Sequence, residues 1–239
     1  MIQKVSAHLK KTYAAIALLS AELIIVFIFF IIAFAGFLFI ADRIFLQHKY
    51  AFDQNAFNFL KTYVTDMNTE ILLFFTFLGT SDFLIPANIL LISYFAFVQK
   101  HKWYSIKIPA ISISSLLLML GLKELFNRPR PLIPLLHPAE GLSFPSGHAL
   151  TSVTFYGLLI YIIWERIKNK NLKWFLIFLL VLLICTIGFS RVYLRVHYAS
   201  DVLAGFCVGL IWLVISLSVL RRIERYTHKE IDPIVDNNA

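Results

Sequence analysis

Long apolar runs alternate with shorter polar segments along most of the chain, and this pattern predicts membrane-spanning helices. Residues 23–40 read LIIVFIFFIIAFAGFLFI, eighteen apolar residues without a charge, which is close to the ~20 residues that a helix needs to cross a bilayer. Five further apolar runs occupy residues 83–98, 108–122, 149–164, 174–189 and 202–220. A hydrophobic core helix of a soluble protein does not explain runs that recur in this way. We therefore expect an all-α polytopic membrane protein with six transmembrane helices, forming a single domain over residues 1–239.

A weaker helical pattern lies in the long connection between the first two spans, residues 41–82. Apolar residues recur at helical spacing from Ala56 to Met67. The polar residues between or beside them are Asp53, Gln54, Lys61 and Asp66. This pattern predicts an amphipathic helix on the membrane surface. The run ILLFFTFL at 71–78 is too short to cross, so we expect it to be interfacial or to dip into the bilayer. The polar C-terminal tail, residues 226–239, is expected to fray.

Composition agrees with a membrane protein, and the distribution of charge predicts its orientation. Hydrophobic residues make up 59% of the chain, where a soluble domain is nearer half apolar. With six spans both termini lie on one side. The loops on that side are 1–15, 99–107, 165–173 and 221–239, and they hold fourteen of the Lys and Arg residues against eight in 41–82, 123–148 and 190–201. Cytoplasmic loops carry the Lys/Arg excess. We therefore expect cytoplasmic termini in the cell's inner membrane. The net charge of +8 then reflects topology, so no nucleic-acid partner is expected.

Ionisable residues gather in two of the loops predicted to face outward. The first loop reads KELFNRPRPLIPLLHPAEGLSFPSGH (123–148) and the second SRVYLRVHYASD (190–201). Together they contain Lys123, Arg130, His148, Arg191, His197 and Asp201. One such residue alone at the end of a span is usually a snorkelling anchor. Their clustering on the face that should be poor in cations has no such explanation, and ionisable groups near membrane depth usually mark function.

Three cations in one place indicate an anionic ligand, and phosphate fits the neighbouring residues. Arg130 and Arg191 can fork onto phosphoryl oxygens, while Lys123 supplies a point charge. Ser146, Gly147 and His148 follow Pro145 at the start of an apolar run. Unpaired backbone N–H groups at such a helix N-terminus bind phosphate, and Gly147 lets the backbone approach the ligand closely.

A nucleophile can be named from the second loop. His197 and Asp201 are spaced i, i+4, so on a helix or helix-like turn they share a face. An Asp that accepts one ring N–H fixes the tautomer of the histidine and leaves the other nitrogen free for attack. With His148 to protonate the leaving group, the residues describe a covalent phosphoryl-transfer site.

Three motifs in these loops resemble the signatures of the type 2 phosphatidic acid phosphatase (PAP2) superfamily. That family has the pattern K-x6-RP, PSGH and SR-x5-H-x3-D. Here the motifs are KELFNRPRP, PSGH and SRVYLRVHYASD, with every motif position present and in order. The six-span layout extends the resemblance over nearly the whole chain. It points to the bacterial membrane branch that dephosphorylates lipid phosphates such as phosphatidylglycerol phosphate and undecaprenyl diphosphate.

The resemblance implies a role for each motif residue. His197 would form a phosphohistidine, Asp201 would orient it, and His148 would be the general acid. The residues that would hold the phosphoryl group are Lys123, Arg130, Ser146, Gly147 and Arg191. The family needs no metal, and no cofactor or obligate protein partner is expected besides the lipid phosphate in its bilayer. Two positions depart from a form common in the branch. Arg195 stands where Gly is frequent and Ala199 where Pro is frequent, which makes Arg195 a candidate for substrate specificity.

Three other functions compete with this interpretation. A transporter or flippase for an anionic substrate would also have six spans and basic residues, but transporters place binding groups near the bilayer midplane. A metallohydrolase built on His148, His197 and Asp201 would have three cations repelling its metal. A serine hydrolase using Ser146 would lack the G-x-S-x-G elbow. We therefore expect an integral-membrane phosphatase that hydrolyses a phosphomonoester or diphosphate lipid.

Overall fold

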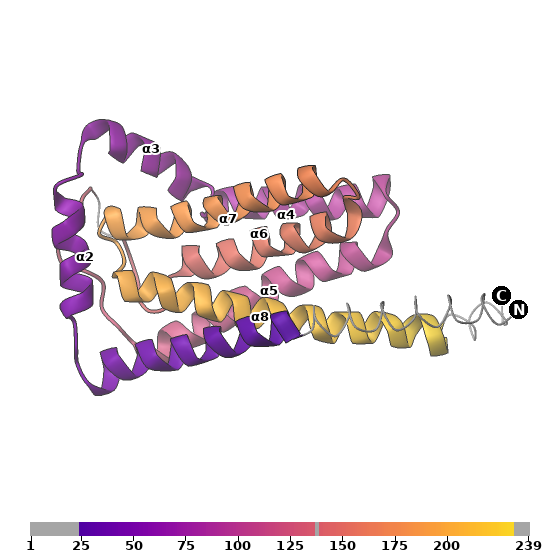
Figure 1. The fold of residues 1–239 in the computed structure, drawn as a ribbon, viewed down its shortest axis with the longest axis horizontal. Helices are drawn as coiled ribbons and strands as arrows, with labels where there is room; N and C mark the ends of the chain where they lie inside the picture. The colour runs from indigo at the N-terminus through magenta and orange to yellow at the C-terminus, as the bar shows by residue number, and fades with distance from the viewer. Residues whose placement is uncertain (1–23, 137–138, 232–239) are drawn as a thin grey trace, which may run out of the picture.

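A bundle of long helices makes up most of the molecule (Figure 1). The computed structural model describes residues 24–136 and 139–231, and these contain helices but no strand. Six helices are long and apolar enough to cross a bilayer: Ile24–Leu46, Ser81–Val98, Lys102–Phe126, Gly147–Arg166, Lys170–Tyr193 and Ala199–Lys229. They coincide with the six predicted spans, so the all-α, six-span prediction is confirmed.

The elements are labelled as in Figure 1. The first span ends in the π-helical turn η1 (Asp42–Leu46) and is followed by α2 (Ala51–Lys61), α3 (Asp66–Phe77), α4 (Ser81–Ser93), η2 (Tyr94–Val98), α5 (Lys102–Phe126), α6 (Gly147–Arg166), α7 (Lys170–Tyr193), α8 (Ala199–Tyr226) and η3 (Thr227–Ile231). The predicted basic segment 1–15 and the end of the tail from residue 232 lie outside the described residues. The tail prediction is wrong up to Ile231, because the helical backbone of α8 continues through η3.

Helix α6 lies in the middle of the bundle, where it contacts α5, α7 and α8. Glycines let α8 approach it closely. A Cβ added at Gly205 would lie 2.7 Å from the Ser146 carbonyl oxygen, and one at Gly209 would lie 2.9 Å from that of Leu150. The first span lies at the periphery, with residues such as Phe27 more than half exposed. Such apolar exposure suits a helix whose solvent is lipid.

The predicted surface helix is present, but it is shorter than expected and one of its polar residues is buried. In Figure 1, α2 runs across one end of the bundle, and α3 follows at an angle. The single helix expected through Met67 is wrong, because the chain breaks between Lys61 and Asp66. Thr65 begins a new helix there, with its side chain accepting a hydrogen bond from the Asn68 amide. Asp53, expected among the polar residues of the surface helix, is instead buried.

Candidate active site

The start of α6 lies where the sequence predicted a helix N-terminus. Ser146 is its N-cap and Gly147 its first residue. The Ser146 amide donates to the Asp201 carbonyl oxygen at 3.0 Å, which fixes this turn against α8. The Ser146 hydroxyl is buried and has no hydrogen-bond partner. At Gly147 a Cβ would lie 2.7 Å from the Met119 sulfur, so a side chain could be accommodated only if Met119 moved.

The three predicted cations come from three different elements and converge beside this turn. Lys123 lies in the last turn of α5, Arg130 lies in the loop after it, and Arg191 lies in the last turn of α7. All three interact electrostatically with one another. Arg130 is aimed by the backbone, since its Nε donates to the carbonyl oxygens of Glu140 and Gly141 at 3.0 and 3.1 Å.

One nitrogen of the Arg191 guanidinium is hydrogen-bonded, whereas another has no hydrogen-bond partner. Its Nη1 donates to Thr76 Oγ1 of α3 at 2.6 Å. Its Nε is buried without a hydrogen-bond partner. Because a buried polar group without a partner is costly, this atom is suited to bind a ligand oxygen.

His197 lies in the short connection between α7 and α8, and its two ring nitrogens meet different partners. Nδ1 is 3.5 Å from Asp201 Oδ2. Nε2 is 3.2 Å from Nη1 of Arg130, which also donates to the Val196 carbonyl oxygen at 2.9 Å. A carboxylate beside Nδ1 favours the tautomer with its proton there, so the lone pair of Nε2 remains available.

The predicted proximity of His197 and Asp201 is confirmed, but it does not arise from a shared helix face. Helix α8 begins at Ala199, after the histidine, and Tyr198 is its N-cap. Asp201 belongs to the capping box, in which its Oδ2 accepts from the Tyr198 amide at 2.9 Å. The helix cap therefore places the carboxylate beside the ring.

Burial sets the protonation of His197. Desolvation lowers the pKa of its imidazole to about 4, with Arg130 and Arg191 acting in the same direction and Asp201 opposing them. The ring is therefore neutral at pH 7, the state in which it can act as a nucleophile. Burial also leaves the Arg130 guanidinium poorly solvated, which lowers its pKa from the usual value.

His148 lies in the first turn of α6, as predicted, and its Nε2 is buried without a hydrogen-bond partner. It interacts electrostatically with Arg191 and His197, so it belongs to the same site. The α3–α4 turn packs on it, because a Cβ at Gly79 would lie 3.1 Å from His148 Cδ2 and 2.6 Å from a methyl group of Ile187.

Arg195 is the predicted specificity residue, and no hydrogen bond or ion pair connects its side chain to the other predicted site residues in the described part of the chain. Its backbone has φ 54°, in the left-handed region that favours glycine. This conformation gives a physical reason why glycine suits the position.

Five residues of the site were not recognised in the sequence. Asp53 and Arg128 are buried and form an ion pair, and Ser200 bonds to both. Ser143 donates to Asp201 Oδ2 and lies 3.4 Å from His197 Nδ1. Thr76 holds Arg191. The position of Arg128 within NRPRP was a usable signal, whereas Asp53 offered none beyond its charge.

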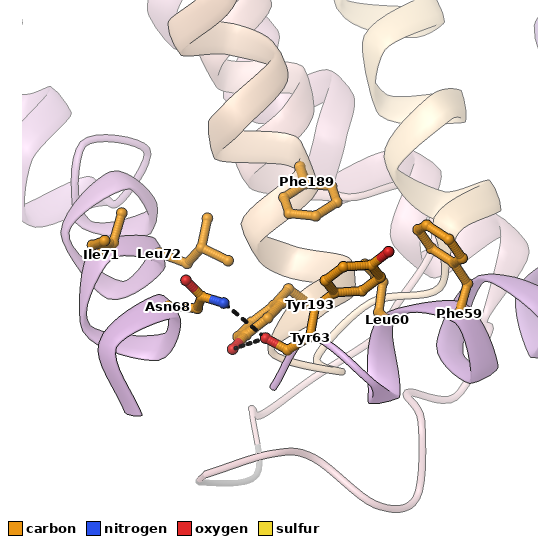
Figure 2. A pocket seen from close by; sticks show the side chains of 8 residues that line it. All are labelled: Phe59, Leu60, Tyr63, Asn68, Ile71, Leu72, Phe189 and Tyr193. Carbon is orange, nitrogen blue, oxygen red and sulfur yellow. Dashed lines mark hydrogen bonds between the residues drawn. The ribbon is translucent and has the colours of Figure 1, made fainter. Parts of the chain in front are cut away.

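An apolar recess lies at the α3–α7 interface, which also carries Arg191 of the predicted phosphate cradle (Lys123, Arg130, Ser146, Gly147 and Arg191). It has a volume of about 390 Å³ and lies between α2, α3 and α7. Figure 2 shows its lining: Phe59, Leu60, Tyr63, Asn68, Ile71, Leu72, Phe189 and Tyr193. The Tyr193 hydroxyl anchors the α2–α3 junction, where it lies within 3.4 Å of the Tyr63 carbonyl oxygen and the Thr65 amide. The recess and the cradle share the α3–α7 interface, because Arg191 contacts Thr76 on the same two helices.

Comparison with known proteins identifies the family. A sequence model of the PAP2 superfamily matches residues 105–225, about half of the chain, and this segment includes all three motifs. The chain belongs to the PAP2 superfamily.

Within the described residues, no three His, Cys, Asp or Glu side chains gather so that they could hold a metal ion.

Similar proteins agree with this membership. Phosphatidylglycerophosphatase B of Bacillus subtilis is 32% identical over 67% of this chain and 79% of its own length. The putative undecaprenyl-diphosphatase YbjG of Escherichia coli is 34% identical over 44% of this chain and 52% of its own. Among solved structures, a transmembrane PAP2-type phosphatidylglycerolphosphate phosphatase from B. subtilis matches with a TM-score of 0.74, at 26% identity, covering 82% of this chain and 98% of that one. LpxE of Aquifex aeolicus matches with a TM-score of 0.56, at 28% identity, covering 69% and 94%.

These similarities support a membrane phosphatase, and the transporter alternative finds no support in them. PAP2 phosphatases are hydrolases, so the predicted reaction class is confirmed.

Proposed function

We propose that the protein hydrolyses a phosphate or diphosphate lipid through a phosphohistidine on His197. The observation that carries this proposal is a set of buried polar atoms without hydrogen-bond partners among the motif residues. Ser146 Oγ, His148 Nε2 and Arg191 Nε all lack a hydrogen bond, and His148 interacts electrostatically with Lys123, Arg130, Arg191 and His197. Donors arranged in this way suit the oxygens of a phosphoryl group.

The reaction follows from the two histidines. The lone pair of His197 Nε2 attacks phosphorus, an N–P bond forms, and the bond from phosphorus to the lipid oxygen breaks. Protonated His148 gives its proton to that leaving oxygen. Asp201 stabilises the imidazolium-like ring through its Nδ1–H. In the second step His148 accepts a proton from water, the hydroxide adds to phosphorus, and the N–P bond breaks to release phosphate.

Lys123, Arg130 and Arg191 neutralise the charge that the phosphoryl oxygens carry through both steps. These cations supply the role that a divalent metal has in other phosphatases, so we propose that turnover needs no added metal. The helix N-terminus at Ser146 and Gly147 adds backbone donors from a fixed direction.

A lipid substrate is favoured by the surroundings of the site. The apolar recess on the α3–α7 interface can hold part of a hydrocarbon chain while the phosphate reaches Arg191. The names of the relatives suggest phosphatidylglycerol phosphate and undecaprenyl diphosphate as substrate classes to test, and the resemblance to the PAP2 superfamily adds phosphatidic acid. The basic residues at the opposite end of the bundle support a site that faces the periplasm or exterior and termini in the cytoplasm.

Phosphate release from a panel of these lipids tests the proposal. The purified protein, in mixed micelles with excess chelator, should release phosphate from at least one lipid. His197→Asn should release none, whereas His48→Asn should behave as the parent protein, because His48 is an exposed histidine outside the site. Activity lost in chelator and restored by zinc or magnesium would reject the metal-independent scheme.

Orientation needs a separate measurement. In a background with Cys185 and Cys207 replaced by alanine, single cysteines at the exposed positions Glu140 and Lys168 should react oppositely with an impermeant thiol reagent in intact cells. Labelling of the Glu140→Cys protein alone is expected. Labelling of the Lys168→Cys protein alone would reverse the orientation.

A further inference from the structure

Behind the catalytic histidine lies a buried ion cluster made of two carboxylates and one guanidinium. Arg128 Nη1 donates to Asp201 Oδ1 at 2.5 Å, and Arg128 Nη2 donates to Asp53 Oδ2 at 2.8 Å. The side chains of Arg128, Asp53 and Asp201 are 5%, 2% and 0% exposed. Because one positive charge faces two negative ones, the cluster as a whole is negative.

The cluster is held from several sides, and Asp53 brings the surface helix α2 into it. Ser200 donates to Asp53 twice, from its amide to Oδ1 at 2.9 Å and from its hydroxyl to Oδ2 at 2.7 Å. The Arg128 guanidinium lies 4.0 Å from the centroid of the Tyr198 ring. Neither Asp53 nor Arg128 occupies a signature position, and the mechanism above gives them no role.

The cluster determines how Asp201 faces His197. Arg128 takes Oδ1, so Oδ2 is left for the Tyr198 amide at 2.9 Å, the Ser143 hydroxyl and the imidazole Nδ1 at 3.5 Å. Without the guanidinium, no other hydrogen bond in the described structure reaches Oδ1, so the carboxylate is oriented less firmly, while the Tyr198 amide and the Ser143 hydroxyl still hold Oδ2 near the ring.

We propose that Arg128 and Asp53 are positioning residues for phosphoryl transfer: Arg128 holds the Asp201 carboxylate toward His197, and Asp53 offsets the positive charge that Arg128 brings. Neither residue touches the substrate. This inference rests on the proposed role of His197 as nucleophile.

Opposite charges in the two residues predict opposite effects on the imidazole. The charged and titratable groups that interact with His197 are Asp201 on α8, Arg130 in the loop, Arg191 on α7 and His148 on α6, and Arg128 and Asp53 stand behind Asp201. Burial sets the pKa of His197 to about 4. Removing a positive charge near the ring raises this pKa, and removing a negative charge lowers it.

The experiment measures kcat/KM against pH, from about 3.5 to 8, for the full-length protein in mixed micelles with one lipid phosphate. Arg128→Gln should move the acid limb up by at most about one pH unit, because the loss of a positive charge behind Asp201 favours the protonated imidazole although Arg128 does not contact the ring. Asp53→Asn should move it down, so that the variant keeps a larger fraction of its plateau activity at pH 4. The ionisation of the substrate is the same in every arm and cancels.

Two kinds of control separate positioning from general damage. Lys61→Gln and Asp66→Asn remove exposed charges from α2 and α3 and should leave the limb unchanged. Arg128→Lys keeps the positive charge but lacks the forked guanidinium that reaches both carboxylates. Its acid limb should therefore lie near the parent value, while its kcat should be lower than that of the parent protein. If Arg128→Gln does not fold, Arg128→Lys and Asp53→Asn still provide the comparison.

The pH profiles test the inference, and the activity of His197→Asn tests the proposed function on which the inference rests. Limbs that move in opposite directions support the inference. The inference is overturned if the acid limb stays in place in both Asp53→Asn and Arg128→Gln, or if it moves in the same direction in both. If Arg128→Gln does not fold, an unmoved acid limb in Asp53→Asn overturns the inference. If His197→Asn remains inactive while these limbs stay in place, only the inference fails. If His197→Asn retains activity, the proposed function fails and the inference fails with it.

Discussion

Both ends of the bundle bury charged side chains, and the difference between them separates a binding site from a structural network. At the end away from α2, Lys107 Nζ pairs with Glu224 at 2.7 Å, and Arg221 pairs with Glu165 at 2.9 Å. The Tyr104 hydroxyl also donates to Glu165. These residues line a polar cavity of about 530 Å³, yet their charged atoms find partners within the protein.

The catalytic end is different, because its buried polar atoms are only partly paired. In the described part of the chain, the buried side-chain atoms without a hydrogen bond are Ser146 Oγ, His148 Nε2, Ser152 Oγ and Arg191 Nε. All four lie at this end. A network that ties helices together closes on itself, whereas a site built for a ligand keeps donors free at a cost in stability. Substitutions at the two ends should therefore have different consequences.

The largest expected effect is on catalysis at His197. Replacing it by asparagine removes the atom that we propose forms the covalent bond, so kcat should fall on the order of 10⁴-fold or more. Rapid quench with ³²P-labelled lipid should detect an acid-labile, base-stable phosphoenzyme in the parent protein and none in His197→Asn. A phosphoenzyme that persists in this variant would assign the nucleophile elsewhere.

His148 should matter in proportion to the basicity of the leaving group. General acid catalysis contributes ~10²–10⁴-fold when the leaving oxygen needs a proton. His148→Ala should therefore lose about that much on a lipid monophosphate, and far less on p-nitrophenyl phosphate, whose leaving group is stable as an anion. Steady-state rates on both substrates give the ratio. Equal losses on both would argue against a role as general acid.

At the opposite end, a substitution should cost stability rather than chemistry. Lys107→Met leaves Glu224 without its partner, and breaking a buried pair destabilises by about 3–5 kcal/mol. Thermal unfolding in detergent should show this loss, while kcat of the folded protein stays within about twofold. The double variant Lys107→Met/Glu224→Gln should recover part of the stability. A fall in kcat without a fall in unfolding temperature would mean that this end takes part in the reaction.

The smallest expected effect concerns Arg195, which is strained by its positive φ. Arg195→Gly should stabilise the protein by about 1 kcal/mol, the order of the cost of a left-handed conformation for a residue with a Cβ. Arg195→Ala removes the same side chain but keeps the strain, so it should not stabilise. If both variants lose more activity on a diphosphate lipid than on a monophosphate, the side chain contributes to specificity. Equal changes on the two lipids would assign it no such role.

The sequence predicted the spans and the signature residues because both signals are local. The length of an apolar run can be read directly from consecutive residues, and the motif residues Lys123, His148 and His197 lie within short stretches of chain. The break before Asp66 was missed because apolar spacing continues through it, although Thr65 was available as an N-cap. Asp53 was missed for a different reason. Its partner Arg128 lies far away in the sequence, and only the packing of α2 across the end of the bundle buries the pair.

Because helix α2 lies across that end of the bundle (Figure 1), we expect a lipid to reach the cradle beside the α3–α7 interface. Such a lipid travels within the leaflet, so enzyme and substrate meet by diffusion in two dimensions. The relevant concentration is then the mole fraction of phosphorylated lipid in the bilayer. Diluting substrate-loaded vesicles that contain the enzyme with buffer should leave turnover unchanged, whereas diluting the substrate with inert lipid inside the same vesicles should slow it.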